Sequence, residues 1–152
     1  MIHIYTDGAA QGNPGPGGYG VVMKYNGREK ELSQGYRLTT NNRMELLAVI
    51  AGLEAIKKDG IPITIHSDSQ YVVNAVEKGW LWTWEKVNFK KKANPDLWQR
   101  YIPLHKKFRP KFKWIKGHAG HPENERCDQL AVAAASRGPL LTDDGYEEQK
   151  GL

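Results

Sequence analysis

The segment Met44–Ser69, MELLAVIAGLEAIKKDGIPITIHSDS, decides the fold class because its periodicity changes from helix to strand across one short turn. Leucines and isoleucines fall on one stripe over 44–58, which predicts a helix. Asp59-Gly60 ends it, and isoleucines at alternate positions over 61–65 predict a strand that ends at Asp68. A helix that leads directly into a strand favours parallel strands covered by helices.

The rest of the chain extends this unit into a mixed sheet. Strands joined by tight turns are antiparallel, and strands joined through helices are normally parallel. Alternating or apolar runs predict strands over 2–7, 19–25, 28–36 and 111–115, with a turn-rich loop over 8–18 and helices over 71–78, 95–107 and 123–136. We therefore expect an α/β fold: a mixed five-stranded sheet, an antiparallel meander plus parallel strands, covered by helices.

Length and composition indicate one globular domain. The chain has 152 residues, of which 39% are hydrophobic and 26% charged. A single domain is expected over 1–138, followed by a flexible tail over 139–152. No apolar run approaches the roughly 18 residues of a membrane span, and the N-terminus lacks the features of a secretory signal. The single Cys127 excludes an internal disulfide, so we expect a cytoplasmic protein without membrane association.

The charge is concentrated in one segment. The chain carries a net charge of +5, but between Lys86 and Lys116 there are eleven basic residues and one acidic residue, Asp96. A block of one sign is either a solvated face or a surface for a polyanion such as nucleic acid.

Four carboxylates stand out by position. Asp7 and Asp68 each lie where a predicted strand gives way to a turn. Glu45 lies in the first turn of the long helix, and Asp128 lies in the last helix. Each alone has an ordinary explanation as a turn, helix-dipole or surface residue. If the two strands are neighbours, however, Asp7 and Asp68 meet, and their repulsion requires a cation. A site of carboxylate oxygens favours Mg²⁺ or Mn²⁺, and two ions about 4 Å apart can stabilise the attacking and leaving oxygens of a phosphoryl transfer.

Five motifs, in this order and spacing, resemble those of the bacterial type 1 ribonuclease H family, over Ile2 to about Ser136. They are Thr6-Asp7-Gly8; the glycine-rich run Gly12–Gly20; Thr39–Leu46, TTNNRMEL; Ser67–Val72, SDSQYV; and Trp114–Asp128, WIKGHAGHPENERCD.

The resemblance implies hydrolysis of the RNA strand of an RNA–DNA hybrid, with 5′-phosphate and 3′-hydroxyl ends. Asp7, Glu45, Asp68 and Asp128 match the family's catalytic metal-binding carboxylates, which use Mg²⁺, with two ions expected in the presence of substrate and Mn²⁺ as a substitute. His118 matches a catalytic loop histidine that assists proton transfer or product release.

The resemblance also implies substrate contacts. Its positions near the minor groove of the hybrid correspond to Asn13, Asn41, Asn42 and Gln70. Thr40 and Asn94 correspond to a pocket for a DNA phosphate, although Arg37 stands beside Leu38, where the family's arginine is expected. A basic segment over 80–96, shorter than in the best-known bacterial form, resembles the "handle" that grips the duplex, and its candidate contacts are Lys90, Lys91 and Lys92.

Two alternatives remain at this stage. Another nuclease or strand-transfer enzyme with the same fold would share the carboxylates but not the set of amides. A hybrid-binding module without catalysis would be expected to lack a carboxylate, and all four are present. The expected partner is an RNA–DNA hybrid, bound by a monomer.

Overall fold

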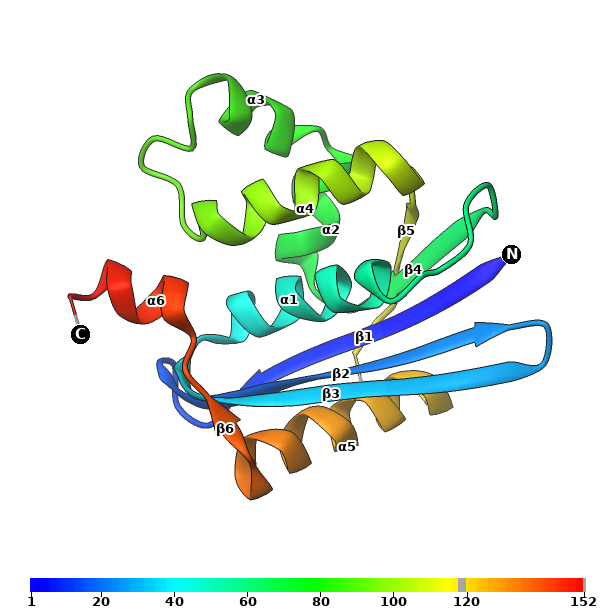
Figure 1. The fold of residues 1–152 in the computed structure, drawn as a ribbon, viewed down its shortest axis with the longest axis horizontal. Helices are drawn as coiled ribbons and strands as arrows, with labels where there is room; N and C mark the ends of the chain where they lie inside the picture. Colours follow the sequence, from blue (N-terminus) through cyan, green and yellow to red (C-terminus); the bar gives the residue numbers. More distant parts are fainter. Residues whose placement is uncertain (118–119, 152) are drawn as a thin grey trace.

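The structure is a computed structural model that describes residues 1–117 and 120–151. Its centre is a six-stranded sheet in the order β5-β4-β1-β2-β3-β6 (Figure 1). The strands are β1 (Ile2–Ala10), β2 (Gly15–Tyr25), β3 (Arg28–Thr39), β4 (Ile63–Ser67), β5 (Lys111–Trp114) and β6 (Leu140–Leu141). The helices are α1 (Asn41–Glu54), α2 (Gln70–Glu77), α3 (Trp80–Lys86), α4 (Pro95–Phe108), α5 (Pro122–Arg137) and α6 (Asp144–Gln149).

The sheet has the mixed topology that the sequence predicts. β1, β2 and β3 form an antiparallel meander, while β4 pairs in parallel with β1 and β5 pairs in parallel with β4. The expected count of five strands is wrong by one, because the short strand β6 pairs in parallel with β3 through Gly35 and Tyr36. The meander is also longer than expected: β1 continues to Ala10 and β2 begins at Gly15, within the predicted loop.

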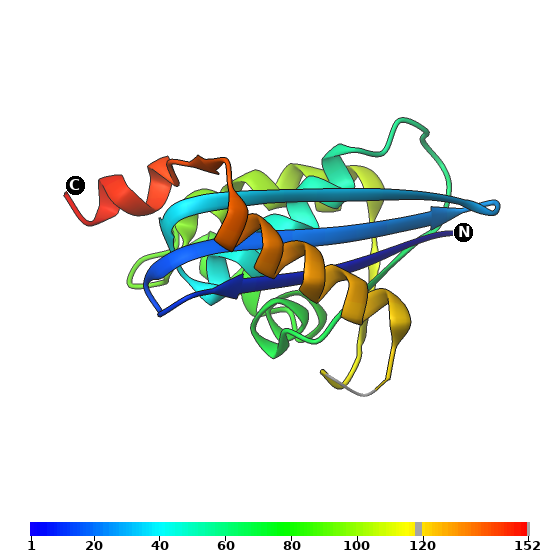
Figure 2. The same cartoon turned by 90° about the horizontal axis from the view of Figure 1, so that it is seen from below.

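Helices cover both faces of the sheet. α1 packs on β1 and β2 from one side, and α5 crosses β1, β2 and β3 on the other (Figure 2). Glycines in the strands allow α5 to lie directly on the backbone. A Cβ atom at Gly20 would stand 2.2 Å from the carbonyl oxygen of Cys127, and one at Gly35 would stand 2.1 Å from that of Ala134. Part of the glycine-rich run therefore forms the surface on which α5 packs, and the run is not only a loop.

The main core lies between the sheet and the layer of α1, α2 and α4. Met44, Leu46 and Ile50 of α1 are fully buried there against Ile4 and Ile65. α4 packs on α1, and α2 contacts α3 and β5. This layer places the N-terminus of α1, which carries Glu45, beside the carboxyl end of β4, which leads into Asp68. No helix in the described ranges is long and apolar enough to cross a membrane.

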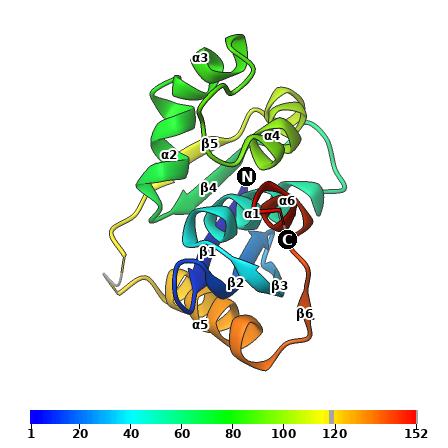
Figure 3. The ribbon, with the colours of Figure 1, turned by 90° about the vertical axis from the view of Figure 1, so that its left-hand side faces the viewer.

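The expectation of a flexible tail over 139–152 is wrong for the described part of that segment. After β6, α6 packs beside the start of α1 (Figure 3), and Tyr146 and Glu147 are buried. Its anchor is polar: the buried Arg43 donates to both carboxylate oxygens of Asp143, at 2.8 Å each, and to those of Asp96, at 2.9 and 2.7 Å. Hydrophobic periodicity does not report contacts of this kind.

Arg43 is the centre of this network. Burial opposes its charge, but the hydrogen bonds that it donates to Asp96 and Asp143 outweigh that effect and raise the pKa of Arg43 above its ordinary value. Thr39 adds a hydrogen bond from its hydroxyl to Asp143, at 2.7 Å. The network joins β3, α1, the start of α4 and the C-terminal segment.

We expect Arg43→Ala to destabilise the fold by about 3–5 kcal/mol, because it leaves the buried Asp143 without its cation. The matched control is Arg37→Ala. Arg37 pairs with Glu147 of the same segment, but its side chain is 61% exposed, so the expected loss is about 1 kcal/mol or less. Urea denaturation of both variants measures the difference. Equal losses would show that the buried network does not anchor the C-terminal segment.

Candidate active site

Asp7 and Asp68 lie side by side because of strand register. The last paired residues of the parallel β1–β4 ladder are Thr6 and Ser67, and the two aspartates follow them directly. The sequence predicts that the strand ends at Asp7. In the structure β1 continues beyond it, in antiparallel pairing with β2. Asp7 is at the end of the parallel part, which is the position that determines its neighbour.

Glu45 reaches these aspartates from the first turns of α1. The helix begins at Thr40, whose hydroxyl accepts a hydrogen bond from the backbone N–H of Arg43 at 3.2 Å. Gly8 permits the close contact between β1 and the helix, because a Cβ atom there would stand 2.4 Å from the backbone nitrogen of Glu45. The N–H of Gly8 donates to Oε1 of Glu45 at 3.1 Å and to Oδ1 of Asp7 at 2.9 Å.

The three side chains form a compact cluster. Oxygen atoms of Asp7, Glu45 and Asp68 all lie within 4.8 Å of one another. Asp128 of α5 lies further out, but it lines the same cleft, which has a volume of about 410 Å³. The structure thus brings together the four carboxylates of the sequence prediction, with three in close contact.

This clustering suppresses ionisation. Burial raises the pKa of Asp7, and the negative charges of Asp68 and Asp128 raise it further. Burial also raises the pKa of Glu45, again with a contribution from the charge of Asp7. In the absence of a cation, the folded state therefore holds protons that these side chains would release in water near neutral pH.

The residues fit a divalent cation. Oε2 of Glu45 is buried and has no hydrogen-bond partner among the described residues. One oxygen from each of Asp7, Glu45 and Asp68 lies within 4.8 Å of the others, close enough for all three to approach one Mg²⁺, whose ligands lie at about 2.1 Å. The donors are carboxylate oxygens, which suit Mg²⁺ or Mn²⁺ better than zinc.

Asp68 has support from β5 that the sequence did not reveal. The half-exposed indole of Trp114 donates a hydrogen bond from Nε1 to the backbone oxygen of Asp68, at 3.2 Å. Gly117 also approaches closely, since a Cβ atom there would lie 2.9 Å from Oδ2 of Asp68. The motif WIKG contains both residues, but only the tertiary structure shows that Trp114 contacts the backbone of Asp68 and that Gly117 lies beside its carboxylate.

The predicted substrate amides surround the cleft. Asn41, Asn42 and Gln70 line it together with the carboxylates. Asn13 stands at the side, where its Oδ1 accepts a hydrogen bond from the N–H of Asn41 at 3.2 Å. Asn41 in turn accepts one from the N–H of Ala10 at 2.6 Å. Because Thr40 caps α1 and Ser69 caps α2, Asn42 and Gln70 are not needed as caps and are available to a ligand in the cleft.

The remaining predicted residues lie to one side. Thr40 and Asn94 line a second cavity, also of about 410 Å³, that shares Asn42 with the cleft. Lys90, Lys91 and Lys92 are exposed in the turns after α3, and Nζ of Lys92 lies 5.5 Å from the ring centre of Trp84. The predicted catalytic residue His118 lies outside the described residues.

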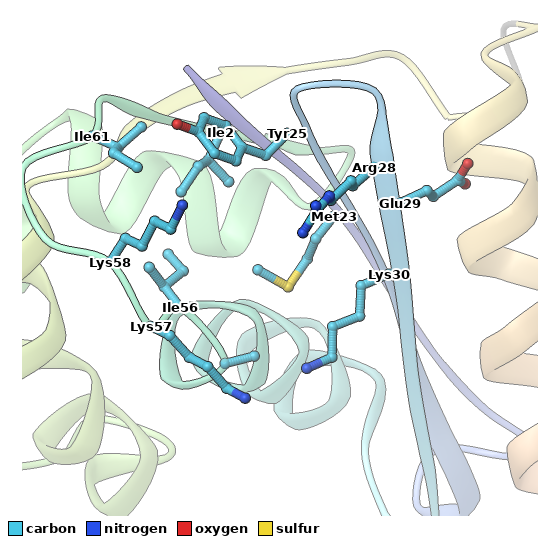
Figure 4. Close-up of a pocket in the computed structure, with 11 residues that line it drawn as sticks. Ile2, Met23, Tyr25, Arg28, Glu29, Lys30, Ile56, Lys57, Lys58 and Ile61 are labelled. Carbon is cyan, nitrogen blue, oxygen red and sulfur yellow. The ribbon is translucent and has the colours of Figure 1, made fainter.

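A further cavity, of about 490 Å³, lies away from this site. Figure 4 shows it near the amino end of β1, with Ile2, Met23 and Ile56 on its apolar walls and Lys57 and Lys58 nearby. None of the predicted site residues that the structure describes lines it. The cleft that holds the carboxylates is therefore the candidate active site.

Comparison with known proteins gives one consistent result. The RNase H family model matches residues 1–136. Ribonuclease H of Desulforamulus reducens is 60% identical over 147 residues, covering 93% of this chain and 92% of the relative. Ribonuclease H of Syntrophus aciditrophicus is 55% identical over 151 residues, covering 96% and 87%.

Solved structures agree with these relatives. LC9-RNase H1, described as a type 1 RNase H with the type 2 active-site motif, has a TM-score of 0.78 and 32% identity, covering 99% of this chain and 81% of that one. LC11-RNase H1 in complex with an RNA/DNA hybrid has a TM-score of 0.69 and 28% identity, covering 89% and 96%.

The raised pKa of Asp7 predicts how stability depends on pH without metal. The folded state binds more protons than the unfolded state above the ordinary aspartate pKa of about 4, so stability falls as pH rises from there through the raised pKa. Asp7→Asn removes this penalty. We expect it to be more stable than the parent by about 1–3 kcal/mol near pH 8, with the gain disappearing towards about pH 4.

Denaturation in EDTA across this pH range measures the effect. The control is Asp59→Asn, at a carboxylate whose side chain is 82% exposed, and its stability should follow that of the parent. A parent whose stability rises steadily over the same range, or an Asp7→Asn variant less stable than the parent near neutral pH, would contradict the proposed repulsion.

Proposed function

The chain belongs to the bacterial type 1 ribonuclease H family, and from that premise we propose how its residues hydrolyse the RNA strand of an RNA–DNA hybrid. The enzyme is metal-dependent, as the family is, and the carboxylate cluster is suited to a metal ion. We propose Mg²⁺, with two ions when substrate is bound and Mn²⁺ as a substitute. The products are proposed to carry 5′-phosphate and 3′-hydroxyl ends.

One observation carries this proposal: Asp7, Glu45 and Asp68 converge around a buried oxygen of Glu45 that has no hydrogen-bond partner in residues 1–117 and 120–151. Asp7, Glu45, Asp68 and, from the far side of the cleft, Asp128 would hold the metal. Mg²⁺ bound there supplies charge stabilisation to the attacking and leaving oxygens of an in-line displacement at phosphorus.

The amides are proposed to select the sugar. The 2′-hydroxyl is the group that distinguishes RNA from DNA, and an amide can both donate to it and accept from it. Asn42 and Gln70 line the carboxylate cleft, so they can contact ribose close to the cleaved bond. Asn13 and Asn41 stand beside them, linked by a hydrogen bond.

Residues outside the cleft are proposed to hold the duplex. Thr40 and Asn94 would contact a phosphate of the DNA strand from the second cavity. Lys90, Lys91 and Lys92 would contact the backbone further along, where each neutralised phosphate releases counterions. His118 is proposed to assist proton transfer or product release, a role expected to contribute about 10²-fold or less to turnover.

We also propose the compartment, the oligomeric state and the partner of the enzyme. The single Cys127 suits a reducing compartment, and we propose a cytoplasmic enzyme that acts as a monomer on an RNA–DNA hybrid. A hybrid-binding module without catalysis is disfavoured because the full set of four carboxylates surrounds one cleft.

Replacement of a cluster carboxylate tests the catalytic assignment. We expect Asp7→Asn and Asp68→Asn each to abolish cleavage while the hybrid still binds in EDTA, because the amide keeps the shape but weakens the metal site. Asp59→Asn should cleave at the parent rate. If both cluster variants kept more than about a tenth of the parent rate, a barrier change below ~1.4 kcal/mol, the metal assignment would be wrong.

Sugar selection has its own test. Gln70→Ala should lower kcat/KM for hybrid by an amount equivalent to about 1–3 kcal/mol, the cost of a lost hydrogen bond in a closed interface. Hybrids with single 2′-deoxy substitutions locate the contact. At one position the substitution should lower the activity of the parent, while it should hardly change the already lowered activity of Gln70→Ala. Gln99→Ala, at an exposed amide of α4, is the control. Equal losses for parent and variant at every position would mean that Gln70 does not read the hydroxyl.

A further inference from the structure

The C-terminal segment forms one wall of the second cavity. Asn13, Thr40 and Asn42 line it from the strand loop and α1, and Asn94 lines it from the start of α4. The opposite wall consists of Gln149 and Lys150, at the end of α6, together with Tyr146. The cavity shares Asn42 with the carboxylate cleft, so a duplex in the cleft would pass next to this wall.

The segment is held in this position by contacts with Arg43 and Asp96, which do not line the cavity. The pair between Arg43 and Asp143 fixes the start of α6, and Gln149 Nε2 donates to Oδ1 of Asp96 at 3.3 Å. Gly145 allows close packing, since a Cβ atom there would stand 2.0 Å from Oδ2 of Asp96. Lys150 is therefore attached to a fixed helix and not to a loose chain end.

Lys150 is the one charged side chain among the described residues that line the cavity. Its Nζ lies 5.7 Å from the ring centre of Tyr146, and it has no ion-pair partner within the described part of the chain. Of the acidic residues in this segment, Asp143 and Glu147 pair with Arg43 and Arg37. Asp144 and Glu148 have no ion pair within the described residues, and they do not line the cavity. A polar cavity with one unpaired cation and amide and hydroxyl groups is chemically suited to an anion.

We propose that Lys150 completes this cavity as a binding site for a backbone phosphate of the DNA strand, and that α6 is the element that positions it. The proposal rests on the proposed contact of Thr40 and Asn94 with that strand. It adds a cation from the C-terminal segment to a pocket in which those two residues supply no charge. Lys150 would thus be a substrate-positioning residue, far in sequence from the motifs of the carboxylate cleft.

The test compares Lys150→Ala with two other variants. Lys57→Ala removes a lysine near the amino end of β1 and is the neutral control, and the triple alanine variant of Lys90, Lys91 and Lys92 is the positive control for phosphate contacts. Hybrid binding is measured in EDTA between low and physiological salt, and kcat and KM are measured with Mg²⁺. Thermal denaturation checks that each variant is folded.

For Lys150→Ala we expect hybrid Kd and KM to rise by about threefold to tenfold at low salt, with kcat unchanged. The log–log salt slope should flatten by up to ~0.9, the value for one phosphate contact. Hybrids with single uncharged methylphosphonate linkages identify the strand: one DNA-strand position should weaken binding of the parent but not of Lys150→Ala.

Other outcomes would overturn the proposal. A Kd and salt slope equal to those of Lys57→Ala would mean that Lys150 does not contact the hybrid, even if cleavage remains normal. If the linkage that weakens binding of the parent but not of Lys150→Ala lies only in the RNA strand, the proposal names the wrong strand. If the folded parent does not bind or cleave hybrid at all, the proposed function fails instead, so the two failures are distinguishable.

Discussion

Parallel pairing of β1 with β4 is the constraint on which the site depends. It ends at Thr6 and Ser67, so Asp7 and Asp68 emerge next to each other at the same edge of the sheet. Gly8 then lets α1 approach closely enough for Glu45 to join them. The cost is electrostatic, since burial and mutual repulsion raise the pKa values of Asp7 and Glu45. A bound divalent cation removes that cost and supplies the charge that phosphoryl transfer requires.

A second polar cluster, formed by Arg43, Asp96 and Asp143, holds the first turn of the same helix. Arg43 is one residue away from Asn42 and two from Glu45, yet its guanidinium points into the fold and binds Asp96 and Asp143. One short stretch of α1 therefore presents a proposed metal ligand, a proposed substrate amide and a structural anchor. The anchor also sets the position of α6, which connects the C-terminal segment to the surface that the hybrid is proposed to occupy.

Much of this arrangement could be predicted from the sequence. Alternation of isoleucines located β1 and β4, the apolar stripe located α1, and ordered motifs identified the four carboxylates of the cleft. Features that depend on tertiary polar contacts could not be predicted. α6 carries few apolar residues, so its docking through Arg43 was missed. Gly18 of β2 was interpreted as a loop residue because its role, contact with the backbone of α5, becomes visible only once the helix is placed.

Cleavage of three labelled duplexes, with Mg²⁺ or with EDTA, tests the central claim most directly. The substrates are an RNA–DNA hybrid, duplex RNA and duplex DNA of the same sequence. The account predicts that the parent enzyme cuts only the RNA strand of the hybrid, only with Mg²⁺, and leaves 5′-phosphate ends. Cleavage that persists in EDTA would contradict the role of the carboxylate cluster. Equal cleavage of duplex RNA would contradict the assignment of the hybrid as the substrate.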